Sequence, residues 1–151
     1  MSSSYVRTQI KDFLTAEAPT EKQADMSGGY EDISQFLSDK GITMLEPWIG
    51  LQFIPGDEQP ITIPAQNDQG VYRETGAIFI HLVDVAKPDV NDSILARGEI
   101  LRNLFRGRRI GEVKIESVTP LNFELGATLD FDGGGFVAAT MILSYENDLN
   151  L

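Results

Sequence analysis

The segment from Gly76 to Val85 constrains the fold of this chain most, because nearly every residue in it is apolar. A strand with one wet face would alternate apolar and polar residues, so this run predicts a strand that is covered on both faces. The only histidine, His81, lies within it and shares a strand face with Phe79 and Val83. We interpret His81 as a hydrogen-bonded core or interface residue rather than an acid/base group.

An amphipathic helix is predicted after this strand, over about residues 93–106. Asn91 or Asp92 is expected to cap it, and Gly107 is expected to end it. The stripe that faces the core consists of Ile94, Gly98, Leu101 and Phe105. Because Gly98 has no side chain, it predicts a close approach between this helix and the sheet.

The N-terminal part of the chain predicts two helices separated by a polar, broken stretch over residues 19–29. The first helix should end near Pro19. Its apolar face consists of Val6, Ile10, Phe13 and Leu14. A shorter helix around residues 30–37 would be stopped by Gly41.

A further strand is predicted from Trp48 to Ile54, where apolar residues fall on one face, and Pro55 is expected to close it. The loop that follows, over residues 55–70, is acidic and includes Asp57 and Glu58. A loop of this length in a small domain is usually functional or disordered. Two interpretations stay open: a solvated loop, or a docking arm that orders against a partner.

The last third of the chain predicts β structure. Alternation of apolar and charged residues begins at Val113, and a β-hairpin is expected over residues 121–146. Its turn would lie at residues 132–135, so Phe131 and Phe136 would flank the tip of the hairpin.

Composition indicates one globular domain over residues 1–151, since 42% of the residues are hydrophobic and 23% are charged. No apolar run approaches the roughly 20 residues of a membrane span, so we expect no membrane association. There is no cysteine, which excludes a disulfide framework and thiolate metal sites. The N-terminus lacks the pattern of a secretory signal, and a reducing cytoplasm is the simplest compartment.

The formal net charge of -11 argues against wrapping nucleic acid, because that affinity comes mostly from Lys and Arg. Five of the twelve Lys and Arg lie between Arg97 and Arg109. An arginine cluster at the predicted helix end either complements the helix macrodipole or forms a positive surface for an acidic partner or a neighbouring copy. The cluster consists of Arg102, Arg106, Arg108 and Arg109.

Candidate catalytic chemistry is sparse. A lone histidine without cysteine cannot make an ordinary zinc site. Residues 130–133 echo the opening of a calcium loop but lack its later ligands, so we interpret them as a turn. Asp57 and Glu58 read as solvated charges rather than catalytic carboxylates. No nucleophile elbow or phosphate-binding loop is present, so we expect no enzymatic activity, no cofactor and no metal.

Four segments follow one another in a distinctive order and spacing. They are Pro47–Gly56, Gly70–Gly76 with its Arg-x-x-Gly before the central strand, the helix ending Leu104-Phe105-Arg106-Gly107, and the late hairpin ending Tyr145-Glu146. Together they resemble the tail terminator, or tail completion, proteins of long-tailed bacteriophages. The resemblance covers about residues 1–146, although residues 19–46 are longer and more acidic than the family pattern.

The resemblance implies an α+β fold with a mixed or mainly antiparallel sheet of four to five strands, a helix packed on one face and an N-terminal helix. It also implies a homo-hexameric ring that caps the tail tube protein, ends its polymerisation and joins the tail to the head–tail connector (stopper) protein. DNA would pass through the acidic lumen without specific binding. The protein would be assembled in the host cytoplasm and belong to the tail or neck of the virion.

The expected mechanism is therefore interfacial. The arginine cluster, with Arg73, is expected to contact acidic groups of a neighbouring subunit or of the tube. The loop that carries Asp57 and Glu58, and the hairpin tip with Phe131 and Phe136, are expected to reach toward the axial partners. The alternatives are another head–tail connector or neck protein, or a non-enzymatic small-ligand-binding α+β domain with an apolar pocket.

Overall fold

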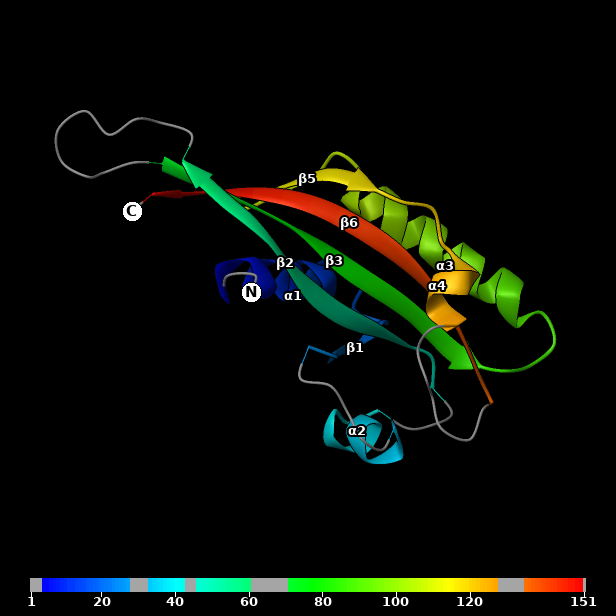
Figure 1. The fold of residues 1–151 in the computed structure, drawn as a ribbon. Helices are drawn as coiled ribbons and strands as arrows, with labels where there is room; N and C mark the ends of the chain where they lie inside the picture. The colour runs from blue at the N-terminus through cyan, green and yellow to red at the C-terminus, as the bar shows by residue number, and fades with distance from the viewer. Residues whose placement is uncertain (1–3, 28–32, 43–45, 61–70, 128–134, 151) are drawn as a thin grey trace, which may run out of the picture.

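The computed structural model describes residues 4–27, 33–42, 46–60, 71–127 and 135–150, and Figure 1 shows how they are arranged. The elements in chain order are α1 (Ser4–Glu17), β1 (Lys22–Asp25), α2 (Ile33–Asp39), β2 (Trp48–Pro60), β3 (Val71–Val85), α3 (Val90–Phe105), β4 (Arg109–Ile110), β5 (Val113–Val118), α4 (Phe123–Ala127) and β6 (Phe136–Asn150). No helix among these residues is long and apolar enough to cross a membrane.

The strands form one mixed sheet in the order β1-β2-β3-β6-β5-β4. β1 runs parallel to β2, and every other neighbouring pair is antiparallel. The expected α+β class is confirmed. The expected number of four to five strands was wrong, because the described residues form a sheet of six. The two edge strands are too short, or too polar, to give an alternating pattern: β4 has two residues, and Ala24 is the only buried residue of β1.

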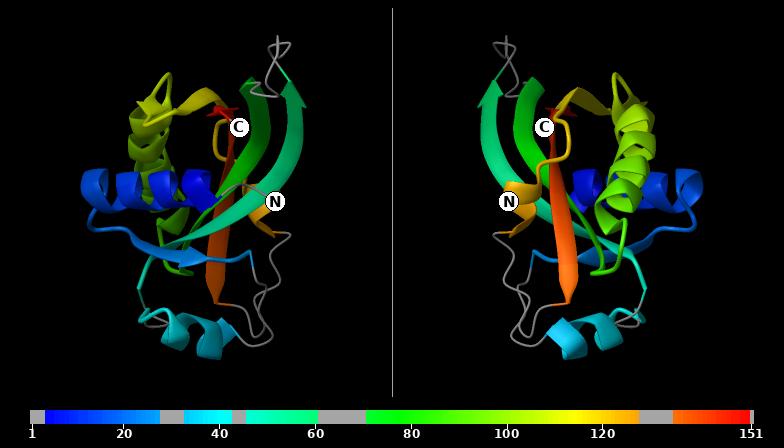
Figure 2. Two further views of the ribbon diagram at one scale, coloured as in Figure 1. Left: turned by 90° about the vertical axis from the view of Figure 1, so that its left-hand side faces the viewer. Right: turned by 90° about the vertical axis from the view of Figure 1, so that its right-hand side faces the viewer.

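The main core lies between one face of the sheet and helices α1 and α3. Figure 2 shows both helices on the same side of the curled sheet. The predicted stripe of α3 and the apolar face of α1 are buried here, against alternate residues of β2, β3, β5 and β6. These include Ile49, Leu51, Phe53, Ile78, Ile80, Leu82, Ile115 and Leu143. Each large side chain buried in this way contributes roughly 1.5–3 kcal/mol.

A second cluster covers the other face of the sheet at the end where α2 lies. Trp48 is fully buried there and packs beside Phe36 of α2, with ring centroids 6.3 Å apart. Val83 of β3 belongs to this cluster, whereas its neighbour Leu82 belongs to the main core. The prediction that this strand is covered on both faces is therefore confirmed at this end of β3.

β2 does not end at Pro55, so the predicted loop over residues 55–70 was wrong for residues 55–60. The strand continues to Pro60, with a register shift in its pairing to β3 between Pro55 and Glu58. The backbone groups of Leu51 and Phe53 face away from β3, toward Met26 and Ser27. Because this orientation repeats at every second residue of a strand, a proline at position 55 is expected to break no hydrogen bond to β3. Residues 61–70 lie outside the described part of the chain.

Of the hairpin predicted over residues 121–146, the described residues show one antiparallel bridge, between Asn122 and Thr140. β6 pairs with β3 and β5, and residues 123–127 form α4 instead of a strand. The physical reason is the side chain of Asn122, whose Oδ1 accepts the backbone N–H groups of Glu124 at 2.8 Å and Leu125 at 3.1 Å. This is a helix N-cap, and it outweighs the alternating apolar pattern. Most of the predicted turn lies outside the described residues.

α3 begins earlier than predicted, and neither Asn91 nor Asp92 caps it. The N-cap is Asp89, whose φ is 63° and whose side chain makes no capping bond. Gly107, with φ of 65°, follows the last turn as expected. A Cβ on Gly98 would collide with the side chain of Leu121, so the predicted close approach is to the connection after β5 rather than to a strand.

His81 is a buried, hydrogen-bonded residue, as predicted. Its Nδ1 lies 2.7 Å from the hydroxyl oxygen of Thr140, and its Nε2 lies 3.1 Å from Oε1 of Gln52. Because Oε1 accepts, Nε2 carries the proton, and Nδ1 accepts from the hydroxyl. Burial lowers the pKa of His81 from 6.5 to about 4, since the protonated form loses its hydration.

Replacing Gly56 by alanine is expected to lower the free energy of unfolding by about 1–3 kcal/mol. The added Cβ would collide with the backbone carbonyl of Thr75 on β3, which no side-chain rotation can relieve. Urea unfolding measures the change. Gln59→Ala, at an exposed position of the same strand, is the control and should change stability by less than about 0.5 kcal/mol. Equal stability of both variants would contradict the close approach at Gly56.

Acid should destabilise the wild type more than a His81→Gln variant. The folded-state pKa of His81 lies below the unfolded value of 6.5, so its contribution is complete above pH 6.5 and is lost as pH falls toward about 4. The loss reaches up to about 3 kcal/mol. Unfolding free energies between about pH 7 and pH 4.5 test this linkage. Parallel pH profiles of the two proteins would show that the buried imidazole is not responsible.

Candidate interaction surface

The distribution of ion pairs separates the basic residues into two groups. Eight of the twelve Lys and Arg form ion pairs within the described residues: Arg7, Lys11, Lys22, Arg73, Lys87, Arg97, Arg109 and Lys114. The other four are Lys40, Arg102, Arg106 and Arg108. Three of these four lie at the C-terminal end of α3. Within the predicted arginine cluster, Arg109 therefore has an ion pair among the described residues, whereas Arg102, Arg106 and Arg108 have none there.

Arg106 and Arg108 are exposed on either side of Gly107, where the helix ends. Nε of Arg108 donates to the carbonyl of Leu104 at 3.1 Å, and its guanidinium lies 5.4 Å from the ring centre of Phe13. Arg108 thus satisfies a helix-end carbonyl, which agrees with the macrodipole interpretation. For Arg106, the capping interaction comes from its backbone N–H, which donates to the carbonyl of Arg102. Its exposed guanidinium forms no ion pair with a described residue.

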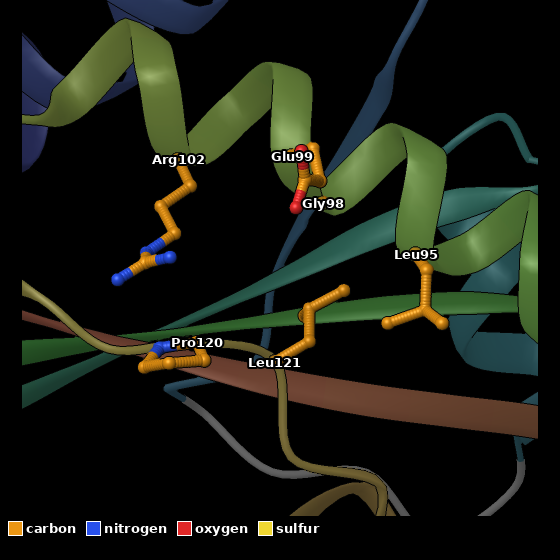
Figure 3. A pocket seen from close by; sticks show the side chains of 6 residues that line it. All are labelled: Leu95, Gly98, Glu99, Arg102, Pro120 and Leu121. Carbon is orange, nitrogen blue, oxygen red and sulfur yellow. The ribbon is translucent and has the colours of Figure 1, made fainter.

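Arg102 lines a small hollow between α3 and the connection after β5. Figure 3 shows its side chain and that of Leu121 in the space between the helix and this connection. The hollow has a volume of about 110 Å³ and is lined by Leu95, Gly98, Glu99, Arg102, Pro120 and Leu121. Nε of Arg102 donates to the carbonyl of Val118 at 3.4 Å. Leu95 is 42% exposed at the same place, so this side of α3 offers apolar surface next to a cation.

Two other predicted interface arginines are paired within the subunit. Arg73 Nε lies 2.8 Å from Asp148 and 3.6 Å from Glu146. The hydrogen bond between Arg73 and Asp148 raises the pKa of Arg73 and lowers the pKa of Asp148. Arg109 lies 3.4 Å from Glu112, with both side chains more than half exposed. Such an exposed pair contributes little to stability, so Arg109 can exchange its partner easily. Arg73, by contrast, is paired with two carboxylates.

Asp57 and Glu58 are exposed in the outer half of β2. The backbone N–H of Asp57 donates to the hydroxyl of Thr75 at 3.4 Å, and its carboxylate accepts from the side chain of Gln59 at 2.9 Å. Among the ion pairs of the described residues, none includes either carboxylate. The pair is therefore a negative site on a strand rather than on the predicted loop.

The structure does not bring the two predicted aromatic tip residues to a described tip. Phe131 lies outside the described residues. Phe136 opens β6 opposite Val85 of β3 and is half-buried against the second core cluster. Its position is therefore explained by packing.

A second hollow, which the sequence did not predict, lies between α1, β1 and α2. It has a volume of about 470 Å³ and is lined by Arg7, Lys11, Asp25, Ser27, Phe36, Asp39 and Lys40. Burial alone would raise the pKa of Asp25, but hydrogen bonds from Lys11 at 2.7 Å and from Ser27 lower it to about 2. The only sequence signal was the spacing of Arg7 and Lys11 on one helical face. The wide, charged lining suits solvent better than an apolar ligand.

Comparison with known proteins defines the fold and no more. No protein-family model matches this chain, and no curated protein matches it. A solved structure whose name describes no activity, ligand or partner aligns with 99% of this chain and 97% of its own length, with a TM-score of 0.55 and 16% sequence identity. At that identity the likeness shows a shared α+β architecture alone.

Proposed function

We propose that this chain is a tail terminator protein of a long-tailed bacteriophage. Six copies would form a ring on the end of the tail tube, stop its polymerisation and join the tail to the head–tail connector protein. The proposal is supported by the order of sequence segments that resembles this family and by an α+β fold compatible with it. On this view the protein is a structural component of the virion and not an enzyme.

The observation that carries the proposal is the group of uncompensated arginines at the end of α3. In a chain with a net charge of -11, most cations have nearby carboxylates to pair with. Arg102, Arg106 and Arg108 nevertheless form no ion pair among the described residues. Cations left together in this way suit an acidic surface outside the subunit. A cyclic ring requires such a patch, because each of its interfaces joins two different surfaces.

The alternatives differ in partner or in the kind of site. Another head–tail connector or neck protein would use the same ring and differ only in what it binds. A small-ligand-binding domain would need an enclosed apolar pocket of roughly 300–1,000 Å³. The hollow beside Gly98 is smaller, at about 110 Å³, and the larger hollow is mainly charged. These dimensions favour a protein that works through its surface.

A variant with Arg106→Glu and Arg108→Glu is expected to cap tail tubes poorly while keeping the fold of the wild type. Reversing both charges places like charges against an acidic partner, and capped tube ends should decrease at least about fivefold. Negative-stain microscopy of the protein mixed with isolated tail tubes counts the capped ends. Circular dichroism and urea unfolding check that the subunit is intact.

Lys40→Glu is the matched control, because Lys40 is also exposed and also without an ion pair in the described part of the chain. It directly follows α2, and Figure 2 shows α2 at the opposite end of the sheet from the outer end of β2. Its reversal should leave capping unchanged. If the double arginine variant caps tubes as well as the wild type does, the arginine cluster only complements the helix macrodipole. A wild-type protein that neither forms rings nor binds tube ends would exclude the terminator function.

A further inference from the structure

We infer that the arginine end of α3 docks on the outer edge of β2 in a second copy of this chain, where Asp57 and Glu58 receive Arg106 and Arg108. This inference rests on the proposed ring and names the surface that the neighbouring subunit contributes. It differs from the sequence-based expectation, in which the segment with Asp57 and Glu58 reached toward the axial partners.

β2 is the outermost strand of the sheet at this level. β1 pairs only with Trp48 to Leu51. Among the described residues, two further contacts lie on that side: the backbone N–H of Met26 donates to the carbonyl of Leu51, and the backbone N–H of Phe53 lies 3.4 Å from the hydroxyl oxygen of Ser27. Beyond Phe53 no described strand covers the outer edge of β2. The segment with Asp57 and Glu58 therefore faces outward from the sheet.

The acidic edge of the sheet, at Asp57 and Glu58, and the basic edge, at Arg109, lie at the same position along the strand direction. We call this position the height. A cross-strand row spans five strands, from Glu58 in β2 to Ile110 in β4; its members are Glu58, Glu74, Asn147, Val113 and Ile110. The adjacent row runs from Thr75, which contacts Asp57, to Arg109; its members are Thr75, Glu146, Lys114 and Arg109. Asp57 and Glu58 thus lie at the β2 end of these rows, and Arg109, which follows Arg106 and Arg108 closely in the chain, lies at the β4 end.

Equal height is the geometric condition for a ring. A rotation about an axis parallel to the strands moves each copy sideways without changing its height. One copy's arginine end then meets the β2 edge of the next copy, and the contact joins two different surfaces, as cyclic symmetry requires. The charges match as well, because Arg106, Asp57 and Glu58 all lack ion-pair partners among the described residues of their own subunit.

The contact should be made by side chains rather than by adding a strand. Pro55, the register shift before Glu58, and the charges of Asp57 and Glu58 are devices that protect an edge strand from pairing. On the opposite side β4 has only two residues, which is too short to template a neighbour. An interface of exposed charges is sensitive to salt.

Two charge-reversed variants test the inference by sedimentation velocity. The first carries Asp57→Arg and Glu58→Arg, so both of its edges are basic. The second carries Arg106→Glu and Arg108→Glu, so both of its edges are acidic. Each variant alone should self-associate at least about tenfold more weakly than the wild type. An equimolar mixture should associate again, because every contact in an alternating ring then joins opposite charges.

Lys40→Glu and Glu17→Arg reverse exposed charges elsewhere on the subunit and should leave association unchanged. Circular dichroism checks that each variant is folded. Three results would each overturn the inference. The Asp57/Glu58 variant could associate as strongly as the wild type, the equimolar mixture could fail to associate, or the wild type could stay monomeric at every concentration. Rings that follow the charge exchange but ignore tube ends would refute the terminator function and leave this interface standing.

Discussion

The antiparallel pairing of β3 with β6 is the constraint on which the rest of this structure depends. Both strands have 15 residues, and the register runs unbroken from Val71 opposite Asn150 to Val85 opposite Phe136. Because successive side chains alternate between faces, a slip of one residue would move the main core to the solvent side. The pairing therefore fixes which residues face α1 and α3, and the twist of such long strands gives the sheet its curl (Figure 1).

The same pairing also sets the positions of the charges at the two edges of the sheet. On α3, Arg97 lies 2.7 Å from Glu21, with both side chains 15% exposed, and so ties the helix to the segment before β1. Arg106, further along the same helix, has no carboxylate partner in the described part of the chain. One helix thus provides a structural arginine near its middle, and at its end arginines that form no ion pair among the described residues. That division suits a subunit whose stability and assembly rely on different residues.

Much of the fold was predictable from the sequence, because local periodicity reports burial directly. The helical spacing that begins at Val6 gave α1, the stripe through Gly98 gave α3, and the alternation from Val113 gave β5. The failures share one cause. β1, the outer half of β2 and α4 depend on a neighbouring strand or on a single capping side chain such as Asn122. Neither leaves a periodic pattern.

The sequence by itself determined that this chain forms an α+β domain with an arginine cluster at the end of a helix, because composition and periodicity are local properties. Only the tertiary structure decided which charged side chains form ion pairs within the described residues and which do not. It paired Arg73 with Asp148, residues far apart in the chain, and it placed Glu58 and Ile110 at opposite ends of one row. Ion pairing and height on a sheet depend on distances in space, which strand register sets and sequence spacing does not reveal.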